Sequence, residues 1–208
     1  MLQKTIRVLL VIVMLFFSML MLRITLPYLS LKPNIDFLRT KQGVIHLPLW
    51  RLAFYVHVFS SSFVLILGIF QFLPGVMKRM PNWHRMAGKI YILLVLGISG
   101  PGGLVMAFYA NGGWPARISF IITAVLWMAF TALAYAKVRR GEFVKHEAYM
   151  IRSYALTLSA ITLRAYAFIL PMIIHLHPRP EYVLIAWLSW VPNLAVAEWI
   201  IFRKKIKQ

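Results

Sequence analysis

The stretch WRLAFYVHVFSSSFVLILGIFQFL, residues 50–73, decides what kind of fold this chain adopts. Its only charged residue is Arg51, at the start, and most of the remaining side chains are apolar or aromatic. As a helix, a segment of this length crosses the roughly 30 Å of hydrocarbon in a bilayer. Lipid cannot hydrogen-bond an exposed backbone, so the stretch predicts a transmembrane helix.

Similar apolar runs recur along the 208 residues, which are 61% hydrophobic with a mean hydropathy of +0.76. A soluble domain is roughly 45–50% apolar. The sequence therefore predicts an all-α, polytopic membrane protein, with 1–208 as one membrane domain and 50–170 as its core. The expected helices cover about 5–26, 50–73, 86–110, 114–136, 147–170 and 182–202.

Three irregular segments are expected. The polar stretch 27–49 contains Pro27, Pro33 and Pro48 and is predicted to lie on the membrane surface. The sequence GISGPGG, residues 97–103, is predicted to kink the third helix, and Pro171 is predicted to interrupt the fifth.

The net charge of +18 is explained by membrane topology rather than by nucleic-acid binding, because no nucleic-acid-binding motif is present. With the N-terminus inside, six crossings place most basic residues on the inner side. That side holds Lys4, Arg7, Lys78, Arg79, Arg85, Lys89, Lys137, Arg139, Arg140, Lys145, Arg203, Lys204, Lys205 and Lys207. The outer side holds Lys32, Arg39, Lys41, Arg51, Arg117 and Arg179. We expect cytoplasmic N- and C-termini, with the basic face on anionic lipid headgroups.

Cysteine is absent, which excludes disulfides, thiolate catalysis and iron–sulfur ligation. No nucleophile–base–acid constellation for hydrolysis is present, so the sequence does not favour an enzyme. His175 and His177 in the HLH motif supply only two ligands, too few for a metal site by themselves. Metal or redox chemistry would therefore depend on the 6 His and 11 Met residues.

The fifth expected helix, KHEAYMIRSYALTLSAITLR at 145–164, is unusually polar for a transmembrane segment. At helical spacing one face carries small and polar side chains between His146 and Arg164, so this face is predicted to point into the bundle. The second and third helices show matching faces. These stripes are Met150, Ser153, Thr157 and Ala160 in the fifth helix; His57, Ser61, Val64, Gly68 and Gln71 in the second; and His84, Gly88, Tyr91, Val95 and Gly102 in the third.

The number of residues from each helix end gives the depth of an ionisable group in the membrane, and these depths fall into two planes. His84 and His146 share an inner plane, and His57 and Arg164 share an outer plane. Glu198, on the sixth helix, falls near the inner plane, where Arg152 is its expected partner. Lys and Arg side chains can also reach the interface by snorkelling, so their presence alone does not prove a site.

Three functions fit these residues. In the first, His84 and His146 are the axial ligands of a b-type haem in an electron-transfer component, with Gly88 or Gly68 making room for the ring and arginines pairing with propionates. In the second, a small-solute or proton-coupled transporter uses His57, Arg164, Arg152 and Glu198 as relay or substrate groups. Gln71 and Tyr91 are further candidates for a second site or relay. In the third, the chain is a non-catalytic membrane scaffold. The sequence names no redox or transport partner.

Two motifs carry a resemblance to a known family. WHRMAGKIY (83–91) and HEAYMIRSYALTLSAITLR (146–164) resemble a family of bacterial predicted membrane proteins classed as a domain of unknown function. The family pattern is H-R-x-x-G-[RK]-x-Y, followed by H-x-x-[WY]-M-x-R-S-[YF]-A. The resemblance covers roughly residues 50–170 and implies no particular activity. The positions that it marks are His57, Gln71, His84, Arg85, Gly88, Tyr91, His146, Met150, Arg152, Ser153, Tyr154 and Arg164.

The layout also resembles, more loosely, the four-helix di-haem cytochromes of the b561 type. Those proteins place a histidine on each of four core helices. The run 114–136 has no histidine, so the resemblance implies at most one haem site here.

Overall fold

A computed structural model describes residues 2–206 of the chain. Within them, six helical segments are long and apolar enough to cross a membrane. This confirms the prediction of an all-α protein with six transmembrane helices. The segments are Val8–Ser30, Pro48–Gln71, Pro81–Phe108, Trp114–Arg139, Phe143–Ile173 and Pro178–Lys204.

The helices begin earlier in the third and fifth spans than the sequence predicts. The third starts at Pro81 instead of about 86, and the fifth at Phe143 instead of 147. Proline suits a first helical turn, where its missing N–H costs no hydrogen bond. His84 and His146 therefore lie inside helical first turns. The elements are α1 Leu2–Thr25, η1 Leu26–Ser30, η2 Asp36–Lys41, α2 Pro48–Gln71, α3 Pro74–Arg79, α4 Pro81–Leu94, η3 Val95–Ser99, α5 Gly100–Phe108, α6 Trp114–Arg139, α7 Phe143–Thr157, α8 Ser159–Ile173, α9 Pro178–Leu188 and α10 Val191–Lys205.

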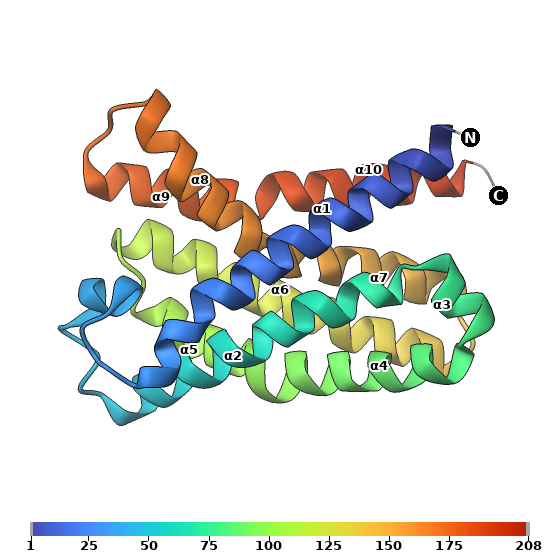
Figure 1. Cartoon of the computed structure of the whole chain (residues 1–208), viewed down its shortest axis with the longest axis horizontal. Helices are drawn as coiled ribbons and strands as arrows, with labels where there is room; N and C mark the ends of the chain where they lie inside the picture. The colour runs from blue at the N-terminus through green and yellow to red at the C-terminus, as the bar shows by residue number, and fades with distance from the viewer. Residues whose placement is uncertain (1, 207–208) are drawn as a thin grey trace.

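The helices form an elongated bundle with two distinct ends (Figure 1). We call the end where α1 begins and α10 finishes the terminal end; it also carries α3 and the α6–α7 turn. The opposite end, which carries η1, η2 and the α8–α9 connection, is the loop end. Helix α2 packs on α4 and α5, α6 packs on α5 and α7, and α1 lies across α2. Helix α10 packs on α7, and α9 packs on α6 and α8.

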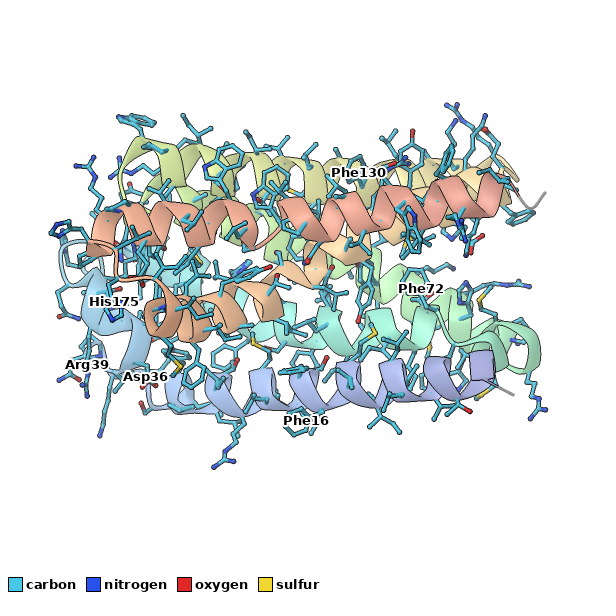
Figure 2. All side chains as sticks on the ribbon, turned by 90° about the horizontal axis from the view of Figure 1, so that it is seen from above. Phe16, Asp36, Arg39, Phe72, Phe130 and His175 are labelled. Atoms are coloured by element: carbon cyan, nitrogen blue, oxygen red, sulfur yellow. The ribbon has the colours of Figure 1, made fainter. Side chains whose placement is uncertain are left out.

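The core lies among the four middle spans. Its buried side chains come from α2, α4, η3, α6 and α7, and Trp190 adds one from the connection between α9 and α10. The larger members are Ile69, Tyr91, Trp127, Met150, Tyr154 and Leu156. By contrast, α1 exposes a strongly apolar surface, with Leu9 60% and Phe16 63% exposed. Phe16 points away from the other helices in Figure 2, as expected for a side chain that faces lipid.

The third span is irregular at the position that GISGPGG predicts. Residues Val95–Ser99 form a π-helical turn between α4 and α5. Pro101 has no N–H to donate, and a π-turn accommodates the mismatch in the hydrogen-bond ladder. The turn is tied to α2 by Ser60 and Ser99, whose hydroxyl oxygens lie 2.6 Å apart.

The prediction that Pro171 interrupts the fifth span is wrong. Helix α8 continues through Pro171 and ends two residues later at Ile173, although the proline has no N–H to donate to the preceding turn. The break occurs earlier, at Leu158, between α7 and α8. Ser159 donates to the carbonyl of Leu156 and Thr157 to that of Ser153, and such hydroxyl bonds to the preceding turn bend helices. The single straight face expected from His146 to Arg164 is therefore split in two.

The polar stretch 27–49 packs on the start of α2. Tyr28 and Leu38 are buried against Trp50 and Phe54, and the Tyr28 and Phe54 rings meet edge to face at 5.0 Å. Lys41 anchors this segment to the α5–α6 turn. Its Nζ donates to the carbonyl of Tyr109 at 2.6 Å and to Oδ1 of Asn111 at 2.7 Å.

Lys41 has an unusual environment for a lysine. It is 4% exposed, its Nζ lies 5.5 Å from the centre of the Phe37 ring, and within the described residues it forms no ion pair with a carboxylate. Burial, together with the nearby Arg117 guanidinium, lowers the pKa of Lys41 from 10.5 to about 8. The charged form is therefore destabilised in the folded protein.

Stability should rise with pH between about 8 and 10.5, because over this window the folded protein holds fewer protons at Lys41 than the unfolded chain does. The gain is at most about 3 kcal/mol at 1.36 kcal/mol per pKa unit. Thermal unfolding in detergent at several pH values, for the wild type and Lys41→Met, checks this. Lys41→Met should lose this contribution, and the exposed Lys32→Met should keep it. Identical pH profiles for the wild type and Lys41→Met would contradict the assignment.

Candidate functional site

Three polar side chains gather at the terminal end of the core. Gln71 ends α2, His84 lies in the first turn of α4 and His146 lies in the first turn of α7. Both histidines lie at the same end of the bundle, because α4 and α7 both start there (Figure 1). Gln71 packs on α4 one turn beyond His84, since a Cβ added to Gly88 would lie 3.2 Å from Oε1 of Gln71. We call Gln71, His84 and His146 the terminal-end cluster.

His146 is fixed by the neighbouring helix α6. Its Nδ1 lies 2.8 Å from the carbonyl oxygen of Ala134. A carbonyl only accepts, so Nδ1 carries the proton, and Nε2 is the lone-pair nitrogen of the neutral ring. The turn before α7 is held by Glu142, which accepts from Lys145 at 2.5 Å and from Lys137 at 3.1 Å. These bonds hold the pKa of Glu142 below its usual range.

Two atoms of the terminal-end cluster have no hydrogen-bond partner in the described part of the chain. They are Nε2 of Gln71 and Nδ1 of His84, and both are buried. A buried polar group without a partner costs about 1–3 kcal/mol, and natural proteins rarely leave such groups unpaired. The two atoms therefore mark a place where a bound ligand would find hydrogen-bonding or ligating groups.

A hydroxyl network closes the cluster off from the middle of the bundle. The Tyr91 hydroxyl lies 2.9 Å from Oγ of Ser153 and 2.8 Å from Oγ1 of Thr157. Trp127 donates from Nε1 to Thr157 at 2.9 Å, and Thr131 lies 2.7 Å from Ser153. The network joins α4, α6 and α7. It confirms that the predicted polar faces of the third and fifth spans point inward.

The α6 contribution was not predicted, because this helix contains no histidine and no charged residue between Arg117 and Lys137. Trp127, Thr131 and Ala134 lie at spacings of four and three residues, so they share one helical face. A tryptophan and a threonine on one face of an apolar helix are the signal that could have identified it. The Ala134 carbonyl could not have been identified, since any residue supplies one.

Arg152 and Glu198 pair as predicted. Nε and Nη2 of Arg152 donate to the two carboxylate oxygens at 2.5 and 2.7 Å. The Arg152 guanidinium also lies over Tyr149 and Phe130; Phe130 is marked in Figure 2. Arg152 follows His146 by six residues, so it occupies a different face of α7, toward α10. The structure thus separates this pair from the terminal-end cluster.

The side of α7 that faces α10 contains a cavity of about 290 Å³. Lys204 forms an ion pair with Glu147 at this cavity. Its lining is Val144, Lys145, Glu147, Ala148, Tyr149, Ile151, Arg152, Ile201 and Lys204.

His57 and Arg164 lie toward the loop end, away from the terminal-end cluster. Nδ1 of His57 lies 2.7 Å from the carbonyl oxygen of Ser99 in the π-turn. Arg164 lies on α8, where its Nη1 donates to the carbonyl of Ala160 at 3.0 Å. His175 lies in the α8–α9 connection at the loop end (Figure 2). In the described residues, no group of three or more His, Asp or Glu side chains is arranged to hold a metal ion.

These features define a class of protein: a multi-pass integral membrane protein of six helices with a polar, histidine-containing core. The chain belongs to the family described as "Predicted membrane protein (DUF2306)", whose model matches residues 54–201. A curated relative, "Ava biosynthesis cluster protein G" of Aspergillus versicolor, is 29% identical over 80 residues. That match covers 37% of this chain and 23% of the relative. No solved structure matches the chain.

Tyr91→Phe should destabilise the protein by about 1–2 kcal/mol, since it removes a fully buried hydroxyl that joins α4 to α7. Tyr135→Phe, at a position 41% exposed on α6, is the matched control and should leave stability unchanged. The measurement is thermal or denaturant unfolding in detergent. Equal effects of the two substitutions would show that the network does not stabilise the helix contacts.

Proposed function

We propose that this protein binds a b-type haem between His84 and His146 and serves as an electron-transfer component of the membrane. The observation that carries the proposal is the hydrogen bond of His146, which fixes its tautomer. Its Nδ1 donates to the Ala134 carbonyl, which leaves Nε2 free to ligate. Metal-bound histidines in proteins regularly show this arrangement, because the second bond fixes the ring and raises its basicity.

The donor set fits such a cofactor. Within the described residues the His84 side chain forms no hydrogen bond, and its buried Nδ1 is unpartnered, so the imidazole is free to turn toward a ligand. A b-type haem bound by two neutral imidazoles would supply reversible one-electron chemistry. The absence of cysteine is compatible with a haem held by histidines alone.

Of the two glycines predicted to make room for a haem ring, Gly68 and Gly88, only one can do so. Gly68 makes no space, because the Tyr154 ring fills it; an added Cβ would lie 2.0 Å from Cε2 of Tyr154. The space beside Gly88 is occupied by the end of the Gln71 side chain. Since Nε2 of Gln71 has no partner, displacing this flexible amide would break no hydrogen bond at that atom. Gly88, rather than Gly68, is therefore the position that supports a bound ring.

The rest of the chain would hold the ligands and exclude water. Glu142 and its two lysines fix the turn that leads to His146. The Tyr91 network seals the site toward the middle of the bundle, and Tyr91 itself is fully buried. The Arg152 guanidinium is paired with Glu198, so it is not a free partner for a propionate.

We further propose that the terminal end faces the cytoplasm of a bacterium, in its inner membrane. The start of α1 and the finish of α10 lie at one end of the bundle, together with the α6–α7 turn (Figure 1). This end carries the larger group of basic residues, in agreement with the positive-inside rule. The exposed side chains of Arg79, Arg85 and Arg140 at this end would suit anionic lipid headgroups. Lys207 lies outside the described residues, as do the side chains of Lys4, Arg7, Lys78 and Lys205.

A transport path is supported less well. Such a path would join His57 to Glu198 through the middle of the bundle. Tyr91, Val95 and Ser99 lie along this route, and all three are 0% exposed, so no water-sized space touches them. The packing therefore favours an electron-transfer site over a solute path. Of the four buried side-chain atoms without a partner in the described residues, two lie together in the terminal-end cluster, which favours a ligand there over a purely structural scaffold.

An absorption spectrum of the protein purified from haem-replete cells tests the proposal. We expect a b-type Soret band and α band, and we expect His84→Ala and His146→Ala each to lose most of the bound haem because each removes an axial ligand. Gln71→Ala, which alters the same cluster without removing a ligand, should retain it. The exposed His46→Ala is the second control. Colourless wild-type protein, or full haem retention in both histidine variants, would contradict the proposal.

The orientation can be tested separately, because the chain has no cysteine of its own. A single cysteine at Arg140, in the α6–α7 turn, should be labelled by a membrane-impermeant maleimide only after the cells are opened. A single cysteine at Lys32, between η1 and η2, should be labelled in intact, outer-membrane-permeabilised cells. Both replaced side chains are exposed. The opposite labelling pattern would reverse the proposed orientation.

A further inference from the structure

The cavity of about 290 Å³ between α7 and α10 lies at the depth of lipid headgroups. Its lining comes from the first turns of α7, which begins at Phe143, and from the last turns of α10, which ends at Lys205. These turns are also the ends of two membrane spans. The volume is at the lower end of the roughly 300–1,000 Å³ of ligand sites, so it fits a headgroup better than a whole lipid.

Each cation that lines the cavity has a glutamate as its partner. Lys145 pairs with Glu142, Arg152 with Glu198, and Lys204 with Glu147. The cavity therefore offers no surplus of positive charge to a purely anionic ligand. A ligand that itself carries one charge of each sign is the better electrostatic match.

Two of the paired groups keep hydrogen-bonding capacity for such a ligand. Arg152 donates to Glu198 from Nε and Nη2, so Nη1 takes no part in that pair. Lys204 donates to Oε1 of Glu147, so Oε2 of this carboxylate takes no part in theirs. The Glu147 side chain is 44% exposed and that of Arg152 is 20% exposed, so a ligand can reach both. The cavity thus presents one anionic acceptor and one cationic donor.

The order of these two groups along α7 matches the order of charges in a zwitterionic phospholipid. Arg152 follows Glu147 by five residues, which places it about 7 Å farther from the terminal end, deeper in the span. In phosphatidylethanolamine the phosphate adjoins the glycerol, and the ammonium is the outermost group. The phosphate would therefore meet Arg152 while the ammonium meets Glu147, through charge-assisted hydrogen bonds. Apolar side chains complete the walls: Val144, Ala148, Ile151 and Ile201.

A primary ammonium fits the cavity better than a quaternary one. It donates three hydrogen bonds, whereas the trimethylammonium of choline donates none and is recognised by aromatic cages. Among the described residues that line the cavity, Tyr149 is the one aromatic residue, and the Arg152 guanidinium already lies over its ring at 5.3 Å. The lining therefore provides a carboxylate for a primary ammonium and lacks a cage for choline.

We propose that the α7–α10 cavity binds the headgroup of a phospholipid that carries a primary ammonium, phosphatidylethanolamine, with Arg152 on the phosphate and Glu147 on the ammonium. His146 points away from this cavity, toward the Ala134 carbonyl of α6, so the proposal does not depend on haem binding. A lipid held between α7 and α10 would stabilise the contact of the sixth span with the core, because a ligand of the folded state stabilises that state.

The test titrates the full chain in detergent with phosphatidylethanolamine, phosphatidylcholine or phosphatidylglycerol of the same acyl chains and measures the unfolding midpoint. We expect a saturable rise of a few degrees with phosphatidylethanolamine. The rise should be smaller with its N,N-dimethyl analogue and smallest with phosphatidylcholine, because each methyl group removes an N–H donor. Phosphatidylglycerol, which has no ammonium, should also give a smaller rise.

Glu147→Gln should remove the preference for phosphatidylethanolamine over phosphatidylcholine, since a neutral amide does not pair with the ammonium. It leaves Lys204 at a position 50% exposed, where water can replace the lost partner, so this variant should fold. Ala148→Phe fills the cavity without changing a charge and should lower the response to phosphatidylethanolamine. Asp36→Asn, which removes an exposed acid at the loop end, is the matched control and should respond like the wild type (Figure 2).

Three results would overturn the proposal. The first is an equal response of the wild type to phosphatidylethanolamine and phosphatidylcholine, which would show that the ammonium is not recognised. The second is a larger response to phosphatidylglycerol, which would show that the site selects net negative charge. The third is an unchanged preference in Glu147→Gln or an unchanged response in Ala148→Phe, which would place the lipid elsewhere on the protein.

Discussion

Hydrocarbon offers no hydrogen-bond partner, and this constraint organises the whole molecule. Backbone groups satisfy it by forming helices, and the polar side chains satisfy it by turning toward one another. Tyr91 is the centre of that arrangement, because its hydroxyl joins α4 to α7 and, through Thr157 and Ser153, to Trp127 and Thr131 of α6. Three helices are thereby fixed in rotation about their axes. His84, His146 and Gly88 take their positions from the same rotation.

The helix breaks follow from the same constraint. At the α9–α10 junction the carbonyl of Ser189 is satisfied by Thr162 and by Nδ2 of Asn193, which also bonds the carbonyl of Ala155. At the π-turn the Ser99 carbonyl accepts from His57. Each irregularity in the backbone is therefore matched by a side chain from a neighbouring helix. The breaks are local adjustments that leave few buried polar atoms unpaired, and they let α8 depart from the line of α7 (Figure 1).

The two ends of the core use histidine in the same way and differ in what surrounds it. His57 and His146 both donate from Nδ1 to a carbonyl of another helix, so each keeps Nε2 available. At the terminal end the neighbours are a second imidazole and an amide, groups that suit a neutral ligand or a metal-centred one. At the loop end the His57 ring lies against Gly103 of α5 and donates to the carbonyl of the π-turn, so it holds two helices together. The role of each histidine follows from its neighbours rather than from the imidazole itself.

The sequence by itself determined the six helices, because long apolar runs in a chain of this composition have no other stable form in lipid. It also determined which faces point inward, since the spacing of Ser153, Thr157 and Tyr91 on their helices is a local property, and it paired Arg152 with Glu198, where one acid and one cation share a depth. Local patterns could not determine the break at Leu158, which separates Arg164 from the face of His146, or the filling of Gly68 by Tyr154. Local patterns could not predict either that the Ala134 carbonyl accepts a hydrogen bond from His146. Only the tertiary structure decided these points, because each depends on which side chains from distant helices come to fill the same space.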